Sequence, residues 1–469
     1  MPINAQLTFI GGAGQVTGSC YLLELNGKKV LLDCGMVQGR DQIREWHKFR
    51  FQFKPKDIDA VILSHAHIDH SGLLPLLVAK GFQGKIYCTN GTAELLPVLL
   101  KDSVFLYLKD LEWQNRKAAR AGKKQHEPVM QLSDAERVVK LCEATPYNKR
   151  IHPMPGMELE FNDAGHILGS AIVQLWLKGR QGMRHLVFSG DLGNPATVLM
   201  NDPAQISTAD IVLMESTYGD RNHKNLDDTV TEFAAALDEA YAAGGNVFIP
   251  AFALGRSQEI LYYLGVLYHQ GKLKQKMVFL DSPMAINITE VYNRHFHSFD
   301  PDDTKAMKQQ RAGDLASFLP ILKLSESVED SMAINRFKQG AIIIAGSGMC
   351  NGGRIVHHFK HNLWKNSNHL IFVGFQAQGT LGRRLVDGEQ RIKLFGQDIM
   401  VKAKVHTIGG FSAHAGQSEL LEWAKAIGGQ PQFYLVHGEP KAQEVLQSLM
   451  QQQGCEVSIA EQGQTISLA

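Results

Sequence analysis

The sequence predicts an α/β fold into which a second α/β unit is inserted. Apolar runs that end in turns rich in Gly, His or Asp occur towards both ends of the chain. Between them, four short apolar runs alternate with helical patterns, which is typical of a parallel sheet with crossover helices. No Pro- or Ser-rich linker separates these parts, so we expect the middle one to be inserted rather than appended. The expected divisions are residues 1–220, 221–395 and 396–469.

The N-terminal part is expected to begin with β-structure. Its runs LTFIGG, SCYLLEL and KKVLLDCG are separated by Gly-rich turns, and Asn26-Gly27 is a strong hairpin signal. Ala60–Leu63 is expected to be a buried strand, and the later SGLLPLLVAKG predicts a helix that ends at Gly81. The His- and Asp-rich segment between them is therefore expected to be a loop at the carboxyl end of a strand, where α/β sheets commonly carry functional groups.

The remaining elements follow the same patterns. Residues 92–145 are helical in pattern, with several Lys and Arg residues near the middle that we interpret as a solvated helical face. Strands are expected in GMELEFNDAGHILGS, SAIVQLWL, RHLVFSGDLG and TADIVLMESTYGD. In the middle part they are expected in NVFIPAFAL, KMVFLDSP, GAIIIAGSGM and HLIFVGFQA. Two further strands, each followed by a histidine, are expected in AKVHTIGGFSAHAG and PQFYLVHGEP.

Composition excludes several classes of protein. The chain has 469 residues, of which 44% are hydrophobic and 20% charged, so disordered, collagen-like and disulfide-scaffold proteins are excluded. There are 48 Lys and Arg residues against 47 Asp and Glu, so any nucleic-acid site has to come from local charge. The six cysteines form no CxxC pair, no run approaches a membrane span, and the N-terminus lacks a signal-peptide pattern. These features predict a cytoplasmic protein that does not associate with membranes.

The segment from His65 to His70, HAHIDH, carries the strongest functional signal. It holds four candidate metal ligands within six residues. In an extended chain, His65 and His67 point to one side and Asp69 follows on that side, while a later turn lets Asp69 and His70 face a second point. A catalytic zinc takes about three protein ligands plus water, so the cluster offers too many ligands for one ion. It therefore predicts two adjacent metals, an arrangement suited to phosphoryl transfer.

Further ligands are expected from three loops that each follow an apolar strand. His166 lies in DAGHILGS, Asp191 in FSGDLGN and His437 in FYLVHGEP. A single His or Asp in a loop is more often an ordinary polar residue than a ligand. Together with the HAHIDH segment, however, these three residues complete two coordination shells. His-rich shells favour zinc, and the sequence leaves manganese open as the alternative.

These segments resemble the motifs of the metallo-β-lactamase superfamily. Asp33 in LLDCG matches the first motif, HAHIDH the second, His166 the third and Asp191 the fourth. The resemblance covers essentially the whole chain. It implies an αββα sandwich that holds two zinc ions per chain.

Other segments resemble the β-CASP branch of this superfamily, which consists of nucleic-acid-processing nucleases. Glu215 in MESTYGD matches its motif A, His414 in FSAHAG its motif B and His437 in LVHGE its motif C. The segments AFALGRSQE, GSGMCNGGR and GFQAQGTLGRRL resemble the inserted α/β β-CASP domain. The compact bacterial and archaeal RNA endonuclease-like members match best, since no additional C-terminal domain or N-terminal RNA-binding domain is visible.

The resemblance also implies roles for these residues. One zinc would be held by His65, His67 and His166, the second by Asp69, His70 and His437, with Asp191 bridging both. A metal-activated hydroxide would attack the phosphorus and leave 5′-phosphate and 3′-hydroxyl ends. The candidate catalytic residues are Asp69, His414, Glu215 and Asp33. His414 would be the general acid, Glu215 would orient it and raise its pKa, and Asp33 would orient a ligand histidine. Without the resemblance, Glu215 could equally cap a strand and His414 could equally be an ordinary buried histidine.

The middle part contains a basic window that predicts an RNA-binding surface. Residues 331–395 hold nine Lys and Arg against two Asp and Glu, a net charge of +7 in a chain of +1. Such clusters supply the salt-sensitive part of nucleic-acid binding, and Gly-rich loops can cradle phosphate. Any one of these side chains could equally be a solubilising surface residue. The candidate substrate-binding residues are Arg256, Ser347, Gly348, Arg354, Arg383 and Arg384.

These observations together predict a two-zinc endoribonuclease that acts on single-stranded RNA in a cleft between two domains. A 5′→3′ exoribonuclease or a DNA-processing nuclease is the principal alternative, because it would use the same chemistry. A small-molecule metallo-hydrolase is less favoured, since the long segment between Asp191 and His437 is more than a small substrate needs. A non-catalytic RNA-binding scaffold is disfavoured because all seven expected ligands are intact. The oligomeric state stays open, with a homodimer as one option.

Overall fold

The computed structural model describes residues 5–38, 45–179, 182–195 and 197–468. The chain forms two compact units. Unit 1 comprises the described residues of Met1–Pro195, Asp202–Asn222 and His414–Ala469. Unit 2 comprises the described residues of Ala196–Asn201 and His223–Ala413. Unit 1 is therefore assembled from segments that lie on both sides of unit 2 in the sequence.

Unit 1 contains two seven-stranded mixed sheets. The first has the order β22-β1-β2-β3-β4-β5-β6. Its strands are β1 (Ala5–Gly11), β2 (Cys20–Leu25), β3 (Lys28–Leu32), β4 (Ala60–Ile62), β5 (Lys85–Thr89), β6 (Cys142–Thr145) and β22 (Thr465–Ser467). The second has the order β21-β20-β11-β10-β9-β8-β7. Its strands are β7 (Ile151–Met154), β8 (Met157–Asp163), β9 (Ala171–Gly179), β10 (Gly182–Phe188), β11 (Ile211–Glu215), β20 (Gln432–Val436) and β21 (Glu456–Ile459).

The two sheets of unit 1 pack face to face around one hydrophobic core. Burial alternates along β1, so that Leu7 and Phe9 point inward, where they join Phe161 of β8 in the same cluster. The ring of Tyr21 meets that of Phe188 edge-on, with centroids 5.3 Å apart, and so connects the two sheets. This inter-sheet core holds the strand ends of both sheets in fixed relative positions.

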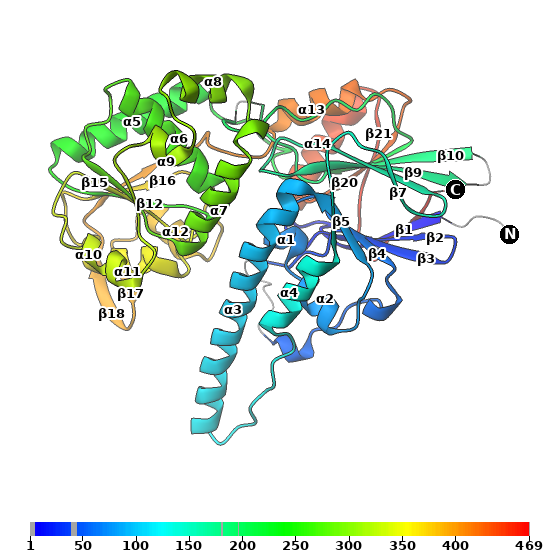
Figure 1. Ribbon diagram of the computed structural model, residues 1–469, viewed down its shortest axis with the longest axis horizontal. Coiled ribbons are helices and arrows are strands. Elements are labelled where there is room, and N and C mark those ends of the chain that lie inside the picture. Colours follow the sequence, from blue (N-terminus) through cyan, green and yellow to red (C-terminus); the bar gives the residue numbers. More distant parts are fainter. Residues whose placement is uncertain (1–4, 39–44, 180–181, 196, 469) are drawn as a thin grey trace. The chain divides into compact units, whose positions relative to one another are not determined.

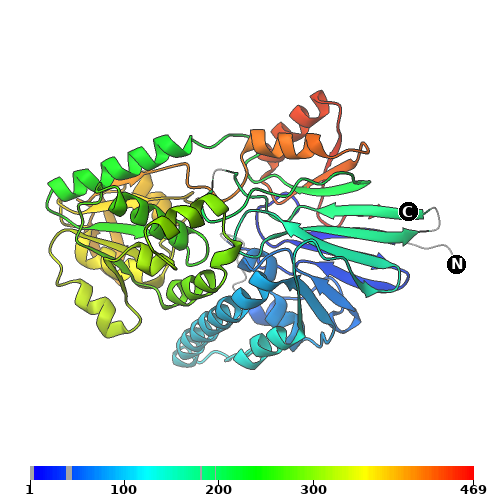
Figure 2. The same ribbon diagram turned by 45° about the horizontal axis from the view of Figure 1, so that its top comes forward.

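Helices cover the outer faces of both sheets and complete four layers (Figure 2). They are α1 (Ile68–Ser71), α2 (Leu74–Ala79), α3 (Asn90–Arg120), α4 (Leu132–Leu141), α13 (Gln417–Ala426) and α14 (Pro440–Gln452). Helices α13 and α14 bury Trp423 and Leu446 against Val212 of the second sheet. Helices α1 to α4 lie along the first sheet (Figure 1). The expected αββα sandwich is therefore confirmed.

Unit 2 is built around a six-stranded sheet with the order β14-β13-β15-β12-β16-β19, in which every pair is parallel. Its strands are β12 (Val247–Pro250), β13 (Met277–Leu280), β14 (Leu322–Leu324), β15 (Ala341–Ala345), β16 (His369–Phe372) and β19 (Lys404–Thr407), beside the hairpin β17 (Arg391–Leu394) and β18 (Gln397–Met400). Its helices are α5 (Leu226–Ala242), α6 (Arg256–His269), α7 (Pro283–Arg294), α8 (Pro301–Gln309), α9 (Leu315–Phe318), α10 (Val328–Ile334), α11 (Gly353–Asn362) and α12 (Leu381–Val386). The expected parallel sheet with crossover helices is present.

One expectation about local structure needs correction. The helical pattern expected over residues 92–145 breaks into α3 and α4, and Cys142–Thr145 is strand β6 rather than helix. This segment pairs in parallel with β5, and tertiary pairing of this kind overrides a local pattern. Over the described ranges, no helix combines the length and apolar character needed to cross a membrane.

Candidate metal centre

The expected metal ligands come from loops that follow strands of both sheets of unit 1. His65, His67 and the helical turn α1 follow β4 of the first sheet. His166 follows β8, Asp191 follows β10 and His437 follows β20 of the second sheet. Because the two sheets face each other, these loops meet at one edge of the sandwich. Side chains that lie up to 372 positions apart in the sequence are thus close together: Asp191 lies 3.5 Å from both His65 and His437.

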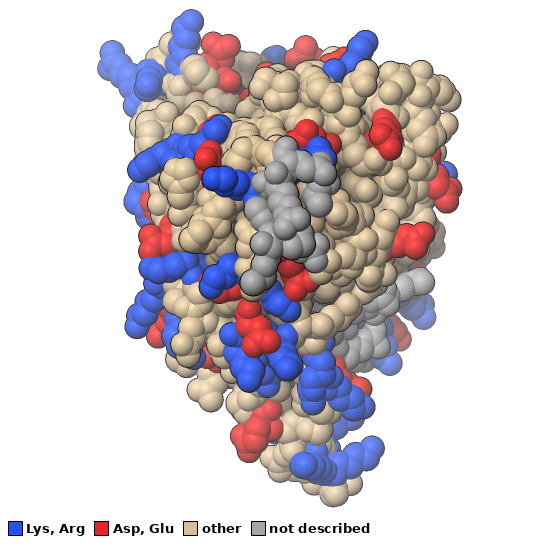
Figure 3. Space-filling model, turned by 90° about the vertical axis from the view of Figure 1, so that its right-hand side faces the viewer, with Lys and Arg blue, Asp and Glu red and all other residues tan. Residues whose placement is uncertain are grey.

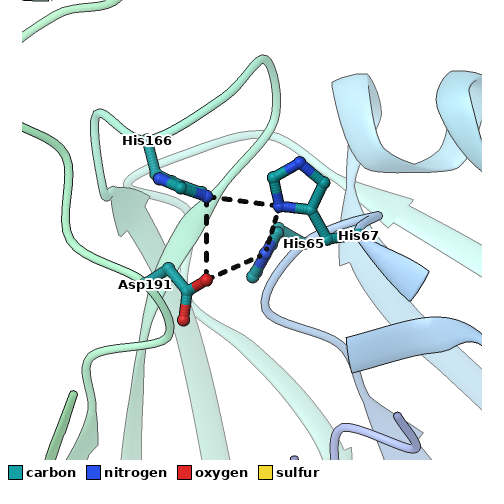
Figure 4. A group of neighbouring side chains, drawn as sticks. All are labelled: His65, His67, His166 and Asp191. Atoms are coloured by element: carbon teal, nitrogen blue, oxygen red, sulfur yellow. Dashed lines mark hydrogen bonds and ion pairs between the residues drawn. The ribbon is translucent and has the colours of Figure 1, made fainter. Parts of the chain in front are cut away.

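The first cluster contains His65, His67, His166 and Asp191, whose side chains point toward one another (Figure 4). His67 Nδ1 lies 3.1 Å from His65 Nε2 and 3.2 Å from His166 Nε2. Asp191 Oδ2 lies 3.5 Å from His65 Nε2 and 3.6 Å from His166 Nε2. Tetrahedral zinc with bonds of 2.0–2.1 Å would hold its ligand atoms about 3.3 Å apart. These four atoms therefore have the separations that such an ion requires.

The second cluster contains Asp69, His70 and His437. His70 Nε2 lies 3.2 Å from His437 Nε2, which lies 3.8 Å from Asp69 Oδ2. The extended pattern of HAHIDH ends at His67, because the chain turns into α1 at Ile68. Asp69 therefore points to this second cluster, and not to the side of His65 and His67.

Asp191 connects the two clusters through its two carboxylate oxygens. Oδ2 faces the first cluster, while Oδ1 lies 3.3 Å from His70 Nε2 and 3.5 Å from His437 Nδ1. Oδ1 is buried and forms no hydrogen bond with any residue that the structure describes. A buried carboxylate oxygen without a hydrogen bond is costly unless a cation compensates it. This donor set of imidazoles and carboxylates fits two cations that share Asp191.

Burial favours the neutral histidines that metal binding requires. It lowers the pKa of His67 to about 4 and the pKa of His65 well below its ordinary value. Burial alone would raise the pKa of Asp69, but the neighbouring His437, His70 and His67 lower it to about 2. Ionised carboxylates and neutral imidazoles are the forms that bind metals, so these shifts suit the histidines of the first cluster and the carboxylate of the second. Burial lowers the pKa of His70, but the charges of Asp191 and Asp33 instead raise it well above its ordinary value, so a metal bound by its Nε2 would displace a proton.

Asp33 holds His70 from behind. Its Oδ2 lies 2.6 Å from His70 Nδ1, and it accepts hydrogen bonds from the Ser64 amide (2.7 Å) and the Ser64 hydroxyl (2.8 Å). With Nδ1 engaged by Asp33, Nε2 of His70 faces the second cluster as the free lone-pair donor. Asp33 is thus in contact with His70, and its role in orienting this ligand stays a prediction.

Glu215 and His414 lie beside the first cluster. His414 Nδ1 lies 3.1 Å from Glu215 Oε1, and the His414 ring packs on that of His166 with centroids 4.5 Å apart. Burial lowers the pKa of His414, but the charge of Glu215 and the hydrogen bond to it, together with Asp191, raise it to about 9. Glu215 also accepts a 2.7 Å hydrogen bond from the amide of Leu192, next to Asp191. One buried carboxylate therefore positions both His414 and the loop of Asp191.

Comparison with known proteins gives a consistent assignment along the chain. Residues 13–134 match the model of the metallo-β-lactamase superfamily, 257–385 that of the β-CASP domain, and 398–460 that of the Zn-dependent metallo-hydrolase RNA specificity domain. Ribonuclease TTHA0252 of Thermus thermophilus is 39% identical over 97% of this chain and 98% of its own. The chain belongs to the β-CASP ribonuclease family of the metallo-β-lactamase superfamily.

Other relatives of this β-CASP chain agree with the assignment. The RNase J-like protein of Methanocaldococcus jannaschii is 32% identical over 92% of each chain. The transcription termination factor FttA of Methanosarcina mazei is 32% identical over 93% of this chain and 67% of its own. A crystal structure of a protein of unknown function from Enterococcus faecalis V583 matches with a TM-score of 0.57 at 13% identity, covering 99% of this chain and 100% of the other. This last likeness concerns the fold alone.

Three residues with side-chain hydroxyl groups contact the proposed metal ligands and were not predicted from the sequence. Ser64 joins Asp33 to His65, its hydroxyl lying 3.0 Å from His65 Nδ1. Thr217 Oγ1 lies 3.1 Å from His437 Nδ1, and Ser170 Oγ accepts a 3.0 Å hydrogen bond from the His166 amide. The sequence indicates these three residues only by their nearness to predicted site residues. Ser64 directly precedes His65, Ser170 follows His166 by four residues, and Thr217 follows Glu215 by two.

The six residues expected to bind substrate all lie in unit 2. Four of them are arginines that form ion pairs. The guanidinium of Arg354 bonds Asp281 at 2.7 Å and the carbonyl oxygens of residues 325 and 326. The other arginine–carboxylate pairs are Arg256–Glu259, Arg383–Asp387 and Arg384–Glu389. Gly348 packs against Phe252, and the buried hydroxyl of Ser347 makes no hydrogen bond within the described part of the chain. Substrate binding by these residues stays a prediction.

Proposed function

We propose that this β-CASP chain is a two-zinc endoribonuclease that cuts single-stranded RNA and leaves 5′-phosphate and 3′-hydroxyl ends. The observation that carries the proposal is the position of Asp191, whose two carboxylate oxygens face separate histidine clusters. Two cations held by clusters that share this carboxylate would suit hydrolysis of phosphodiesters, because they would stabilise charge on both the attacking and the leaving oxygen.

Seven residues of unit 1 would hold the two ions. His65, His67, His166 and Asp191 form one site, and Asp69, His70, His437 and Asp191 form the other. Zinc bound there would supply an activated water as nucleophile and charge stabilisation for the phosphoryl oxygens. The chain orients these ligands through their other ring atoms, as Asp33 does for His70 and Thr217 for His437.

His414 is the residue placed to protonate the leaving 3′ oxygen. Its Nδ1 is engaged by Glu215, so Nε2 is the atom that would carry the proton to the substrate. Its raised pKa keeps this proton bound near neutral pH. Glu215 would act as the positioning residue, because it is buried, acidic and bonded to His414. It lies near Asp191 and His414 but is not among the ligands of the two clusters that share Asp191.

RNA as the substrate is supported by the comparisons and by the charge of unit 2. The match over residues 398–460 is to an RNA specificity domain, and two of the relatives are named as ribonucleases. The basic window of residues 331–395 offers cations for a polyanion, although three of its arginines are paired with carboxylates. Single-stranded RNA is the form whose bases are accessible to a nuclease site.

The test uses zinc-loaded protein with a single-stranded RNA, a DNA of the same sequence and a 5′-blocked RNA, each labelled at the 3′ end. We expect internal cuts in both RNAs that weaken by about 100-fold or more in His414→Ala. His152→Ala, which removes an exposed histidine of β7, is the matched control. Stepwise shortening that the 5′ block stops would show a 5′→3′ exonuclease, and preferential DNA cutting would show a DNA-processing nuclease. No cleavage with both zinc ions bound would overturn the nuclease proposal in favour of a small-molecule hydrolase.

A further inference from the structure

Helix α3 carries an exposed row of aromatic and cationic side chains that the metal centre does not use. Lys101, Phe105, Lys109, Trp113 and Lys117 occur at every fourth position, and side chains four apart on a helix are neighbours. All five are exposed, with Phe105 at 46% and Trp113 at 61%. We call these five residues the α3 row.

The opposite face of α3 explains why the helix is stable without covering this row. Leu99, Leu100, Val104 and Tyr107 are buried, and α4 packs beside the helix. The exposed rings of Phe105 and Trp113 therefore add little to the core of the unit, although burying rings of this size would be stabilising. Exposed aromatic residues grouped in this way are typical of binding surfaces.

The cations of the row already lie on the faces of its aromatic rings. Lys109 Nζ is 5.7 Å from the ring centroid of Phe105, and Lys117 Nζ is 5.4 Å from that of Trp113. These contacts hold each ring beside a positive charge at low entropic cost. A base that takes the place of the lysine on either ring would leave its phosphate beside the displaced ammonium, which in Lys109 is also paired with Glu112 at 3.4 Å.

The segment around the row is positively charged. Residues 101–124 contain seven Lys and Arg against three Asp and Glu, a net charge of +4 in a chain of +1. In Figure 3, Lys and Arg side chains gather towards the lower end of the molecule, where Figure 1 shows the end of α3. This charge distinguishes the row from an apolar surface for a protein partner, and it is complementary to a phosphate backbone.

The helix is attached directly to the metal centre at its other end. The hydroxyls of Thr89 and Thr92 donate hydrogen bonds of 2.5 and 2.8 Å to the carbonyl oxygen of Gly169, in the loop of His166. Phe105 lies 13 residues beyond Thr92, or about 20 Å along the helix, and Trp113 about 12 Å farther. The row therefore lies on the helix whose first turn contacts the loop of His166, with its two rings about 20 and 32 Å farther along the helix axis.

We propose that the α3 row is a second binding site for single-stranded RNA, in which Phe105 and Trp113 stack on bases and Lys109 and Lys117 contact phosphates. This proposal rests on the proposed ribonuclease function and adds a site outside the metal centre. A strand long enough to reach the row would bind more tightly than a short one. Under this proposal Lys109 and Lys117, which the sequence pattern led us to interpret as part of a solvated helical face, contact RNA phosphates.

The test compares cleavage of a single-stranded RNA of about 30 nucleotides with one of about six, near the lower end of single-strand site sizes. For F105A/W113A we expect the ratio of kcat/KM for the long RNA to that for the short RNA to fall about tenfold, through KM. For K109A/K117A the salt dependence of long-RNA binding, measured by fluorescence anisotropy, should decrease by about 1.4 in slope. Unchanged ratios and slopes in both variants would overturn the proposal.

Control variants, RNA-binding anisotropy and light scattering distinguish RNA binding by the α3 row from failure of the ribonuclease proposal and from a role in oligomerisation. Leu106→Ala removes an exposed apolar side chain from the same helix, and K56A/K80A removes two exposed lysines from the same unit; neither should change the ratio or the slope. If the unsubstituted protein cuts neither RNA, the ribonuclease proposal fails, and anisotropy of the long RNA alone decides the α3 row. If F105A/W113A instead converts an oligomer to a monomer in light scattering, with RNA binding unchanged, the row is an interface between copies and the proposal is wrong.

Discussion

The Nδ1 atom of His70 lies 2.6 Å from Oδ2 of Asp33, deep beneath the second metal cluster. Both side chains are almost completely buried, and Ser64 donates two further hydrogen bonds to Asp33. The carboxylate therefore determines which ring nitrogen of His70 is available to a metal. A contact of this kind controls the metal affinity without touching the metal itself.

The substitution Asp33→Asn should weaken metal binding at the second cluster. The amide cannot match the charge of the carboxylate, so the His70 ring loses its fixed orientation. We expect the affinity for the weaker-bound zinc to fall by about 10- to 100-fold. A titration against a chromophoric zinc chelator measures this change, with the exposed Asp398→Asn as the control. Equal zinc affinities of the two variants would show that Asp33 has no such role.

The substitution Glu215→Gln should separate catalysis from metal binding. Glutamine can still accept the hydrogen bond from Leu192, but it removes the charge that faces His414. We expect kcat for RNA cleavage to fall by about 100-fold or more, as in His414→Ala, because proton donation to the leaving oxygen is impaired.

Zinc content measured by mass spectrometry should stay at the unsubstituted value in Glu215→Gln, since the carboxylate of Glu215 is engaged by His414 and the Leu192 amide and is not one of the seven proposed ligands. The exposed Glu456→Gln is the matched control for loss of a carboxylate. A full loss of zinc together with activity would indicate that Glu215 only supports the metal loops, contrary to the proposed role.

Gly35 is needed because the backbone of the metal loop passes directly against it. A Cβ atom there would lie 1.6 Å from the carbonyl oxygen of Asp69 and 2.9 Å from the amide of His70. Gly35→Ala should therefore displace both ligands, destabilise the fold by about 1–3 kcal/mol and reduce zinc binding at the second cluster. Gly313→Ala, where a Cβ meets no atom within 4 Å, is the control for urea unfolding and zinc titration. Matching behaviour of the two variants would rule out this packing argument.

The buried pair Glu259–Arg256 predicts a pH dependence of stability. Burial raises the pKa of Glu259 to about 7 from its ordinary 4.5, and Arg256 only partly opposes this. The folded state therefore binds this proton more tightly than the unfolded state. The stabilisation is fully present below pH 4.5 and is lost as the pH rises through 7, a change of about 3 kcal/mol.

Comparison with Glu259→Gln isolates this effect, because glutamine does not titrate. The stability of the unsubstituted protein minus that of the variant, from urea unfolding of the whole chain, should fall between pH 5 and pH 8. A difference that stays constant or rises over this range would contradict the assignment.

The metal ligands could be predicted from sequence because their signal is local. The HAHIDH segment packs four ligands into six residues, and the other ligand motifs each follow a strand. The contacts between side chains that lie far apart in the sequence could not be predicted. Nothing in the sequence shows that Ser64 would join Asp33 to His65. The place of Asp69 in the second cluster followed only from the family resemblance, because strand alternation alone would put it on the side of His65 and His67, whereas the chain turns into α1 at Ile68.

The surfaces were harder to predict than the site, for the same reason. Arg354 has the sequence context of a phosphate ligand, yet its guanidinium bonds Asp281, which lies 73 positions away. Conversely, the charged pattern of α3 looks like an ordinary solvated face until the exposure of Phe105 and Trp113 is known. Local charge indicates where a polyanion could bind, and only the fold shows which charges are already neutralised.

The most direct test of the account is the number of zinc ions held by the chain and by two single-ligand variants. Native mass spectrometry after stepwise zinc addition should show two ions in the unsubstituted protein. It should show one ion in His67→Ala, which disrupts the first cluster, and one in Asp69→Ala, which disrupts the second. A single ion in the unsubstituted protein, or two ions retained in both variants, would contradict the two-metal centre bridged by Asp191.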